Sequence, residues 1–129
     1  MSLISSISGI RGTIGGKVGE NLTPIDIVKY VSAFITLLKE NEPNKTLRIV
    51  VGRDARISGE MVSSIVCGTI QSMGADVIDV GLSTTPTVEM SVVSHKADGG
   101  IIITASHNPM QWNALKLLRS NGEFVSGAD

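Results

Sequence analysis

The apolar positions of this chain alternate between helical and strand spacing, which predicts an α/β domain with a mixed, mostly parallel sheet. Thr23 and Pro24 are residue types that start helices, and apolar positions three and four apart then predict a helix as far as Glu42-Pro43-Asn44. We expect its buried face to contain Ile25, Val28, Val31, Ile35 and Leu38. Strands are predicted over residues 3–8, 47–51, 75–80, 99–104 and 114–118, and further helices over 58–73 and 85–96. No internal repeat divides this pattern, so residues 1–129 are interpreted as a single domain.

Composition narrows the functions that such a domain can have. Aromatic residues make up 3% of the chain and the net charge is −1, so neither the stacking surface nor the basic surface that nucleic acid requires is expected. No segment has the pattern of a signal peptide or a membrane span, which favours a cytoplasmic protein without membrane contact. The single cysteine, Cys67, lies within a helical pattern and is interpreted as a small buried hydrophobic residue.

One apolar run ends abruptly in polar residues. The strand pattern that begins at Gly99 stops at Ser106-His107-Asn108, and Pro109 then removes a backbone donor and fixes φ. The loops that follow the carboxyl ends of parallel strands carry binding and catalytic groups in α/β proteins. The alternative is a strand followed by an ordinary turn, because Ser, Asn and Pro are common turn residues.

Cationic residues occur in two other loops that are predicted to follow strands. A parallel sheet can bring these loops to one edge, around the hydroxyl of Ser106. The cations gathered there would be Arg11, Arg53, Arg56 and, from the following strand, Lys116. Guanidinium and ammonium groups around a hydroxyl suit a phosphate ester. A second interpretation is that Asp54 pairs with a neighbouring arginine and stiffens its loop instead of contacting a substrate.

Two other kinds of site are not favoured. A Ser-His-Asp hydrolase needs a base that reaches the serine hydroxyl, but Ser106 and His107 are neighbours whose side chains leave the backbone in different directions. The other histidine, His95, is expected at the solvated end of a helix, and no G-x-S-x-G segment occurs. The glycines between residues 9 and 16 do not spell G-x-G-x-x-G, so a dinucleotide site has weak support.

Four segments, in this order, resemble motifs of the α-D-phosphohexomutases, the family of phosphoglucomutase, phosphomannomutase and phosphoglucosamine mutase. They are residues 8–12 (SGIRG), 52–59 (GRDARISG), 85–87 (TPT) and 104–109 (TASHNP). The resemblance covers nearly the whole chain. It implies a three-layer α/β/α domain, the first of four in the family, with the remaining three domains absent from this sequence.

The resemblance also implies a role for the residues of the polar loop. Ser106 is expected to carry the transferable phosphate as a phosphoserine. His107 and Asn108 match the residues beside it that shape the loop and help to bind or orient the reacting groups. Mg²⁺ is expected to bind through the phosphate on Ser106, with its other ligands in a D-x-D-x-R loop outside this chain.

Two cationic positions receive roles in the same way. Lys116, at the end of Asn113-Ala114-Leu115-Lys116, is similar to the lysine of the family's N-G-x-K segment and is a candidate general acid or base. Ala114 stands where the family usually has glycine. Arg11 matches the N-terminal arginine that lines the reaction centre.

The function implied by the resemblance is that of an intramolecular phosphotransferase. Such a mutase interconverts hexose 1-phosphate and hexose 6-phosphate through a phosphoserine and a bisphosphorylated sugar. Its partners would be the phosphosugar and the remaining domains of the enzyme, and the isolated domain is expected to fold without mutase turnover. The alternative is a non-catalytic phosphate-binding or assembly module of the same fold.

Overall fold

The computed structural model describes residues 3–6, 9–104 and 111–125 of the chain. Within them, six strands form one sheet in the order β1-β2-β6-β5-β3-β4. The strands are β1 (Ile4–Ser6), β2 (Gly9–Thr13), β3 (Arg48–Arg53), β4 (Asp76–Leu82), β5 (Gly99–Ile103) and β6 (Trp112–Arg119). The helices are α1 (Pro24–Asn41), α2 (Gly59–Ser72) and α3 (Thr85–Ser94).

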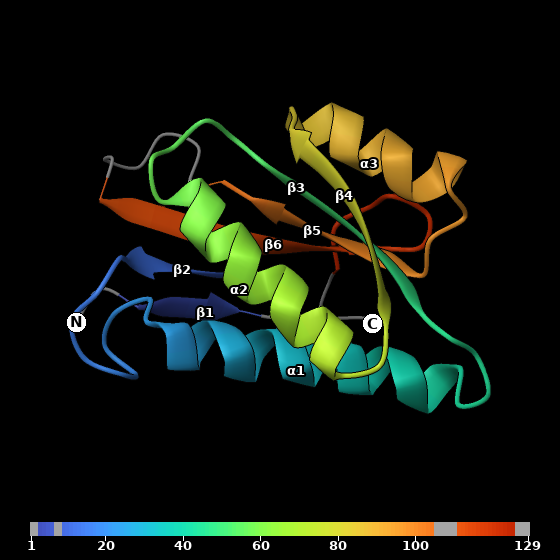
Figure 1. Cartoon of the computed structure of the whole chain (residues 1–129), viewed down its shortest axis with the longest axis horizontal. Coiled ribbons are helices and arrows are strands. Elements are labelled where there is room, and N and C mark those ends of the chain that lie inside the picture. The colour runs from blue at the N-terminus through green and yellow to red at the C-terminus, as the bar shows by residue number, and fades with distance from the viewer. Residues whose placement is uncertain (1–2, 7–8, 105–110, 126–129) are drawn as a thin grey trace.

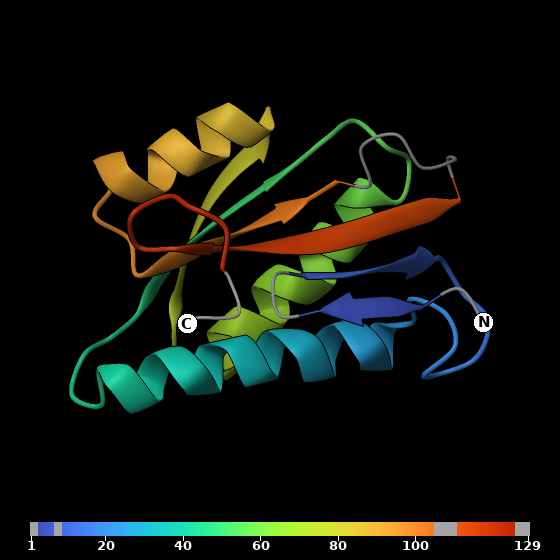
Figure 2. The same cartoon turned by 180° about the vertical axis from the view of Figure 1, so that it is seen from behind.

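The helices cover both faces of the sheet. α1 and α2 lie on one face and α3 lies on the other (Figures 1 and 2). A larger apolar cluster fills the space between the sheet and the first two helices, and a smaller cluster lies under α3. The three-layer α/β/α architecture is therefore confirmed. No helix in the described residues is long and apolar enough to cross a membrane.

The strand pairing confirms a mixed sheet, but parallel pairing is less extensive than the sequence predicted. β3 pairs in parallel with β4 and β5, whereas β5–β6, β6–β2 and β2–β1 are antiparallel. Only residues 104–111 connect β5 to β6. This connection is too short for the crossover that a parallel neighbour needs, so β6 returns directly beside β5.

Helix α1 begins at a capping box, and its predicted buried face is confirmed in part: Val31 and Ile35 are buried and Leu38 packs against the core. The Thr23 side chain accepts a hydrogen bond from the Asp26 amide, and the Asp26 carboxylate accepts one from the Thr23 amide. Ile25 and Val28, predicted to be buried, are 51% and 42% exposed. The Asp26 carboxylate also accepts from the Gly19 amide, and this contact turns the side of the helix that carries Asp26 inward. The buried residues of α1 are Asp26, Ile27, Val31, Phe34 and Ile35.

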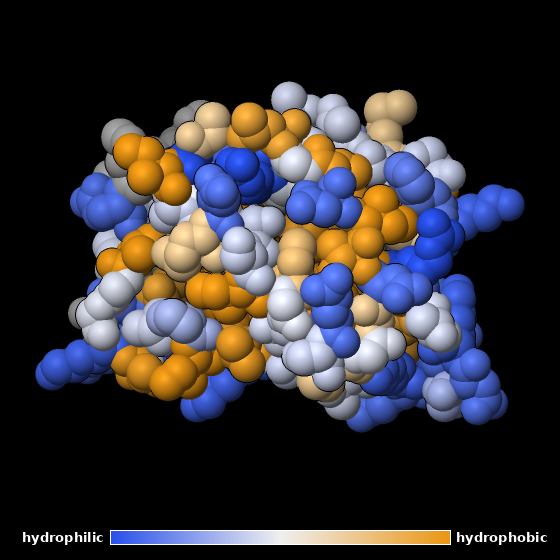
Figure 3. All heavy atoms as spheres, in the orientation of Figure 1, coloured by the Kyte–Doolittle hydropathy of each residue, from blue (hydrophilic) through white to orange (hydrophobic). Residues whose placement is uncertain are grey.

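Apolar and polar side chains are interspersed on the face that α1 and α2 form (Figure 3).

On the opposite face, α3 approaches the sheet closely because two strand positions carry no side chain. A Cβ added at Gly52 would lie 2.4 Å from Cγ2 of Val88, and one added at Gly100 would lie 2.7 Å from Cγ2 of Val92. Both valines are fully buried.

Candidate functional site

The loops after β3 and β5 begin side by side, as the sequence predicted. The amide of Asp54 donates a hydrogen bond to the Ile103 carbonyl at 3.1 Å. The Thr104 hydroxyl donates to Oδ2 of Asp54 at 2.7 Å. Asp54, the first residue after β3, is thus bonded both to the end of β5 and to the first residue after it.

The internal pairing considered for Asp54 is present, and its partner is Arg56. Nε of Arg56 lies 3.5 Å from Oδ2 of Asp54, and Oδ1 of Asp54 accepts from the Arg56 amide at 3.1 Å. Nη1 of Arg56 also donates to the Trp112 carbonyl at 3.1 Å, so Arg56 connects this loop to the start of β6. The side chains of Arg56 and Asp54 are 12% and 29% exposed, so the ion pair is partly shielded from solvent.

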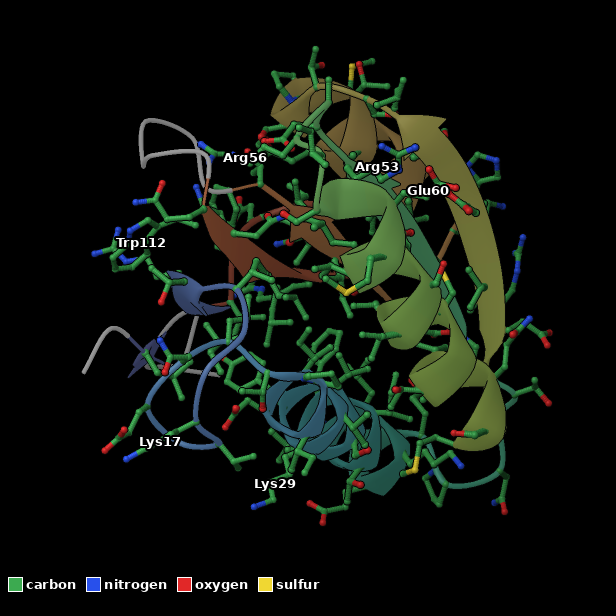
Figure 4. All side chains as sticks on the ribbon, turned by 60° about the vertical axis from the view of Figure 1, so that its left-hand side comes forward. Lys17, Lys29, Arg53, Arg56, Glu60 and Trp112 are labelled. Carbon is green, nitrogen blue, oxygen red and sulfur yellow. The ribbon has the colours of Figure 1, made fainter. Side chains whose placement is uncertain are left out.

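Arg53 does not take part in the link to β6, and its Nη1 instead donates to the carbonyl of the adjacent Asp54 at 3.4 Å. As the last residue of β3 it lies on the sheet face that α2 covers, and its side chain passes the start of that helix at Gly59. Figure 4 shows Arg53 beside Glu60, whereas Arg56 and Trp112 lie toward the other side of the view. The structure therefore separates the two arginines: Arg53 ends β3, and Arg56, in the loop that follows, reaches β6.

Arg11 and Lys116 lie on the same face of the sheet. Arg11 is paired with Ala114 across β2 and β6, and Lys116 is two residues further along β6. Residues at such diagonal positions are roughly 7–8 Å apart, and somewhat less between their Cβ atoms, which is within reach of long side chains. Arg11 was predicted in a loop but lies within β2, because residues 9–13 pair with β6 on one side and with β1 on the other.

The face that carries these two cations is the one on which α3 lies. Lys116 is paired with Ile102 of β5, and Ile102 belongs to the apolar cluster under α3. α3 packs on β3 and β5, so β2 and β6 extend this face beyond the helix. Arg11 is exposed there and Lys116 is half-buried.

The residues of the polar loop itself, Ser106, His107 and Asn108, lie outside the described residues, as does Ser8. The residues that flank this loop are described. The Thr104 amide donates to the Ala114 carbonyl at 3.0 Å, and the Gln111 carbonyl accepts from the Ile14 amide at 2.8 Å. Both ends of the loop are thus bonded into the sheet.

Sequence reasoning missed the polar residues that support these loops. Asn113 is completely buried; its Nδ2 donates to Oγ of Ser58 at 2.9 Å and its Oδ1 accepts from the Ala114 amide. Ser58 is the N-cap residue of α2, but its side chain makes no cap hydrogen bond. Thr104 is 7% exposed. Buried polar side chains are nearly always hydrogen-bonded. Thr104 and Asn113, as polar residues beside or within apolar strand patterns, were the signal in the sequence for such supporting contacts.

The two other nucleophilic or basic groups considered from the sequence are placed elsewhere. Cys67 is half-buried in α2 against the larger apolar cluster, and burial raises the pKa of its thiol. His95 is exposed directly after α3, as predicted. Neither residue takes part in the group formed by the ends of β3, β5 and β6.

Comparison with known proteins connects this arrangement to one family. Residues 4–129 match the phosphoglucomutase/phosphomannomutase α/β/α domain I. A phosphoglucomutase/phosphomannomutase of Thermococcus kodakarensis is 46% identical over 113 residues, which cover 86% of this chain and 25% of that protein. A phosphoglucosamine mutase of Saccharopolyspora erythraea is 38% identical over 128 residues, covering 99% of this chain and 28% of that protein.

A solved structure gives the same result for the fold. A crystal structure from Thermus thermophilus, provisionally described as a phosphomannomutase, superimposes with a TM-score of 0.84 at 27% identity, over 99% of this chain and 28% of that one. The fold is thus an α/β/α domain of the phosphosugar-mutase class. The chain belongs to the phosphoglucomutase/phosphomannomutase family, as its domain I. It spans about a quarter of the length of the curated relatives that it matches.

Proposed function

We propose that this chain is the serine-bearing domain of a phosphosugar mutase, which interconverts hexose 1-phosphate and hexose 6-phosphate through a phosphoserine at Ser106 and a bisphosphorylated sugar. The observation that carries the proposal is the register of β2, β6 and β5. It puts Arg11 and Lys116 on one sheet face, with Lys116 opposite Ile102 in the strand that leads to Ser106. The names of the relatives support the phosphosugar substrate.

In the proposed reaction, phosphoryl transfer requires charge neutralisation and positioning more than covalent chemistry by the protein. A sugar hydroxyl oxygen bonds to the phosphorus of phosphoserine while the bond from phosphorus to Oγ of Ser106 breaks. The proton of the sugar hydroxyl passes to the serine oxygen, with Lys116 as the general acid or base that relays it. The guanidinium of Arg11 binds phosphate oxygens on the same face. His107 and Asn108 orient the reacting groups.

Magnesium is proposed to belong to the complete enzyme, where it would neutralise charge on the transferring group. The described residues of this chain do not form a site for it. They contain no group of three His, Cys, Asp or Glu side chains that could hold a metal ion. Both carboxylate oxygens of Asp54 are already engaged by Thr104 and Arg56. The phosphate on Ser106 would supply the ligand from this domain, and the other ligands would lie outside this chain.

The test is to locate the phosphate on the full-length protein, purified without phosphatase treatment, by intact mass and phosphopeptide mapping. We expect one phosphate on Ser106 that is lost when the acceptor sugar phosphate is added. Ser106→Ala should abolish transfer, whereas Ser94→Ala, at an exposed serine of α3, should retain the wild-type rate. An unmodified Ser106 that also resists a hexose bisphosphate donor would contradict the proposal and favour a non-catalytic phosphate-binding module.

The remaining domains are proposed partners of this chain because the relatives are about four times longer. We therefore expect the purified 129-residue chain to show no mutase turnover. A turnover number for this chain equal to that of the full-length protein would contradict this expectation.

A further inference from the structure

The start of β6 extends beyond the end of β5. The Ala114 carbonyl accepts from the Thr104 amide, so carbonyls at alternate positions of β6 point toward β5. The Trp112 carbonyl, two residues earlier, points to the same side, but β5 ends at Ile103. Nη1 of Arg56 donates a hydrogen bond to this carbonyl at 3.1 Å.

Arg56 is itself held by the carboxylate that binds the end of β5. Oδ2 of Asp54 accepts from the Thr104 hydroxyl at 2.7 Å and lies 3.5 Å from Nε of Arg56. Asp54, Arg56 and Thr104 therefore form a continuous connection, here called the brace, from the end of β5 to the start of β6. The brace joins Thr104 and Trp112, which lie on either side of the polar loop in the chain.

The start of β6 is also fixed from its other side. Thr13 of β2 is paired with Trp112, and the Ile14 amide donates to the Gln111 carbonyl. The same strand, β2, carries Arg11. The pairing of β2 with β6 therefore sets the position of Trp112 relative to Arg11. The brace connects the end of β5 to this same Trp112.

We propose that Asp54, Arg56 and Thr104 are positioning residues for phosphoryl transfer. By setting the separation of Thr104 and Trp112, the brace orients Ser106 relative to Lys116. This inference rests on the proposed function. A displacement of about 1 Å at a reacting group can cost about a hundredfold in rate, so a brace outside the reacting atoms affects the rate constant more than substrate affinity.

Thr104→Val in the full-length protein tests the brace, because it removes the hydroxyl and keeps the shape of the side chain. Thr69→Val is a matched control: the two threonines are 7% and 6% exposed, and each hydroxyl donates one hydrogen bond of 2.7 Å, that of Thr69 to the Ile65 carbonyl within α2. The assay measures kcat and KM for the sugar phosphate and the single-turnover transfer from phosphoserine. We expect Thr104→Val to lower kcat by about tenfold or more with KM changed less than about twofold.

Two further variants separate positioning from stability. Thr104→Ser keeps a hydroxyl and should recover most of the wild-type kcat. Arg56→Lys keeps the charge but lacks the planar fork that reaches a carboxylate and a carbonyl together, so it should lower kcat as Thr104→Val does. Hydrogen exchange of the peptide 111–119 should be faster in Arg56→Lys than in Thr69→Val, because the link to the Trp112 carbonyl is lost.

The outcomes are distinct. If Thr104→Val and Thr69→Val have the same kcat, or Thr104→Ser is as slow as Thr104→Val, the brace does not position the reaction. Unchanged exchange of peptide 111–119 in Arg56→Lys would equally overturn the inference. If the wild-type protein transfers no phosphoryl group from Ser106, the proposed function fails, and this inference fails with it.

Discussion

Replacing Gly52 by alanine tests whether the close approach of α3 to the sheet depends on a missing side chain. The added Cβ would lie 2.4 Å from Cγ2 of Val88 and 3.0 Å from Cγ2 of Val80. Val88 is fully buried and β-branched, so its side chain cannot rotate away without a further clash. Either α3 moves away from the sheet or β3 shifts, and both changes loosen the apolar cluster that contains Val50 and Ile102.

The expected cost is the balance of two effects. Overpacking a core costs about 1–3 kcal/mol. Replacing glycine also lowers the conformational entropy of the unfolded chain, which stabilises the folded state by about 0.4–1 kcal/mol. We therefore expect Gly52→Ala to lower the free energy of unfolding by about 1–2 kcal/mol, or Tm by roughly 3–10 °C for a chain of this size.

Gly68→Ala is the matched control, because it is the same substitution at an exposed position within α2. A Cβ at Gly68 meets nothing within 4 Å. Alanine is favoured over glycine inside a helix by about 0.5–1 kcal/mol, so this variant should be more stable than the wild type. Thermal unfolding of the 129-residue chain, followed by circular dichroism, measures both variants. A Gly52→Ala variant as stable as the wild type would refute the packing argument, as would a destabilised Gly68→Ala.

Three other predictions follow from single groups. Burial alone would raise the pKa of Asp26, but hydrogen bonds from the Thr23 hydroxyl and from backbone amides outweigh it and lower the pKa below its ordinary value of 3.8. The carboxylate therefore stabilises the fold above pH 3.8, and this stabilisation is lost as the pH falls through the lowered pKa. Urea titrations should show Asp26→Asn to be less stable than the wild type by about 1 kcal/mol at pH 7. Near pH 2 the two proteins should be nearly equal in stability. Burial raises the pKa of the Cys67 thiol, so its alkylation at about pH 7.5 should be slower in the folded than in the unfolded chain, and equal rates would contradict this. Lys116→Met should lower single-turnover transfer in the full-length protein by about a hundredfold or more, whereas Lys45→Met, at an exposed ion pair with Asp98, should not.

The positions of the helices and the inner strands along the sequence were predictable because each is rich in apolar residues and is bounded by turn or capping residues. The strand predicted over 99–104 is β5 at Gly99–Ile103, and the helix predicted over 85–96 is α3 at Thr85–Ser94. Spacing alone predicted the buried face of α1 only in part, because Val31 and Ile35 are buried as predicted but Ile25 and Val28 are exposed. Apolar residues occur on several sides of that helix, and its rotation depends on the buried carboxylate of Asp26, whose partner Gly19 belongs to the preceding loop.

The N-terminal strands and the brace depend on contacts between distant parts of the sequence. Residues 9–13 contain two glycines and an arginine and have no strong strand pattern, so β2 forms because β6 offers it a partner. The contact of Arg56 with the Trp112 carbonyl joins positions that are 56 residues apart. A pattern in the sequence can show that Arg56 follows a strand, but the carbonyl that it reaches is defined only by the strand order.

The strand that precedes the polar loop in the sequence, β5, has two kinds of neighbour. β5 is parallel to β3 and antiparallel to β6, so it lies where the parallel and antiparallel parts of the sheet meet. On the parallel side, the loop that follows β3 begins at Asp54 against the end of β5. On the antiparallel side, β6 follows β5 without a crossover helix, so Lys116 is paired with Ile102. Under the proposed function, the antiparallel side of β5 supplies the cation of Lys116 and the parallel side supplies the supporting carboxylate of Asp54. Neither side of the sheet alone provides both groups.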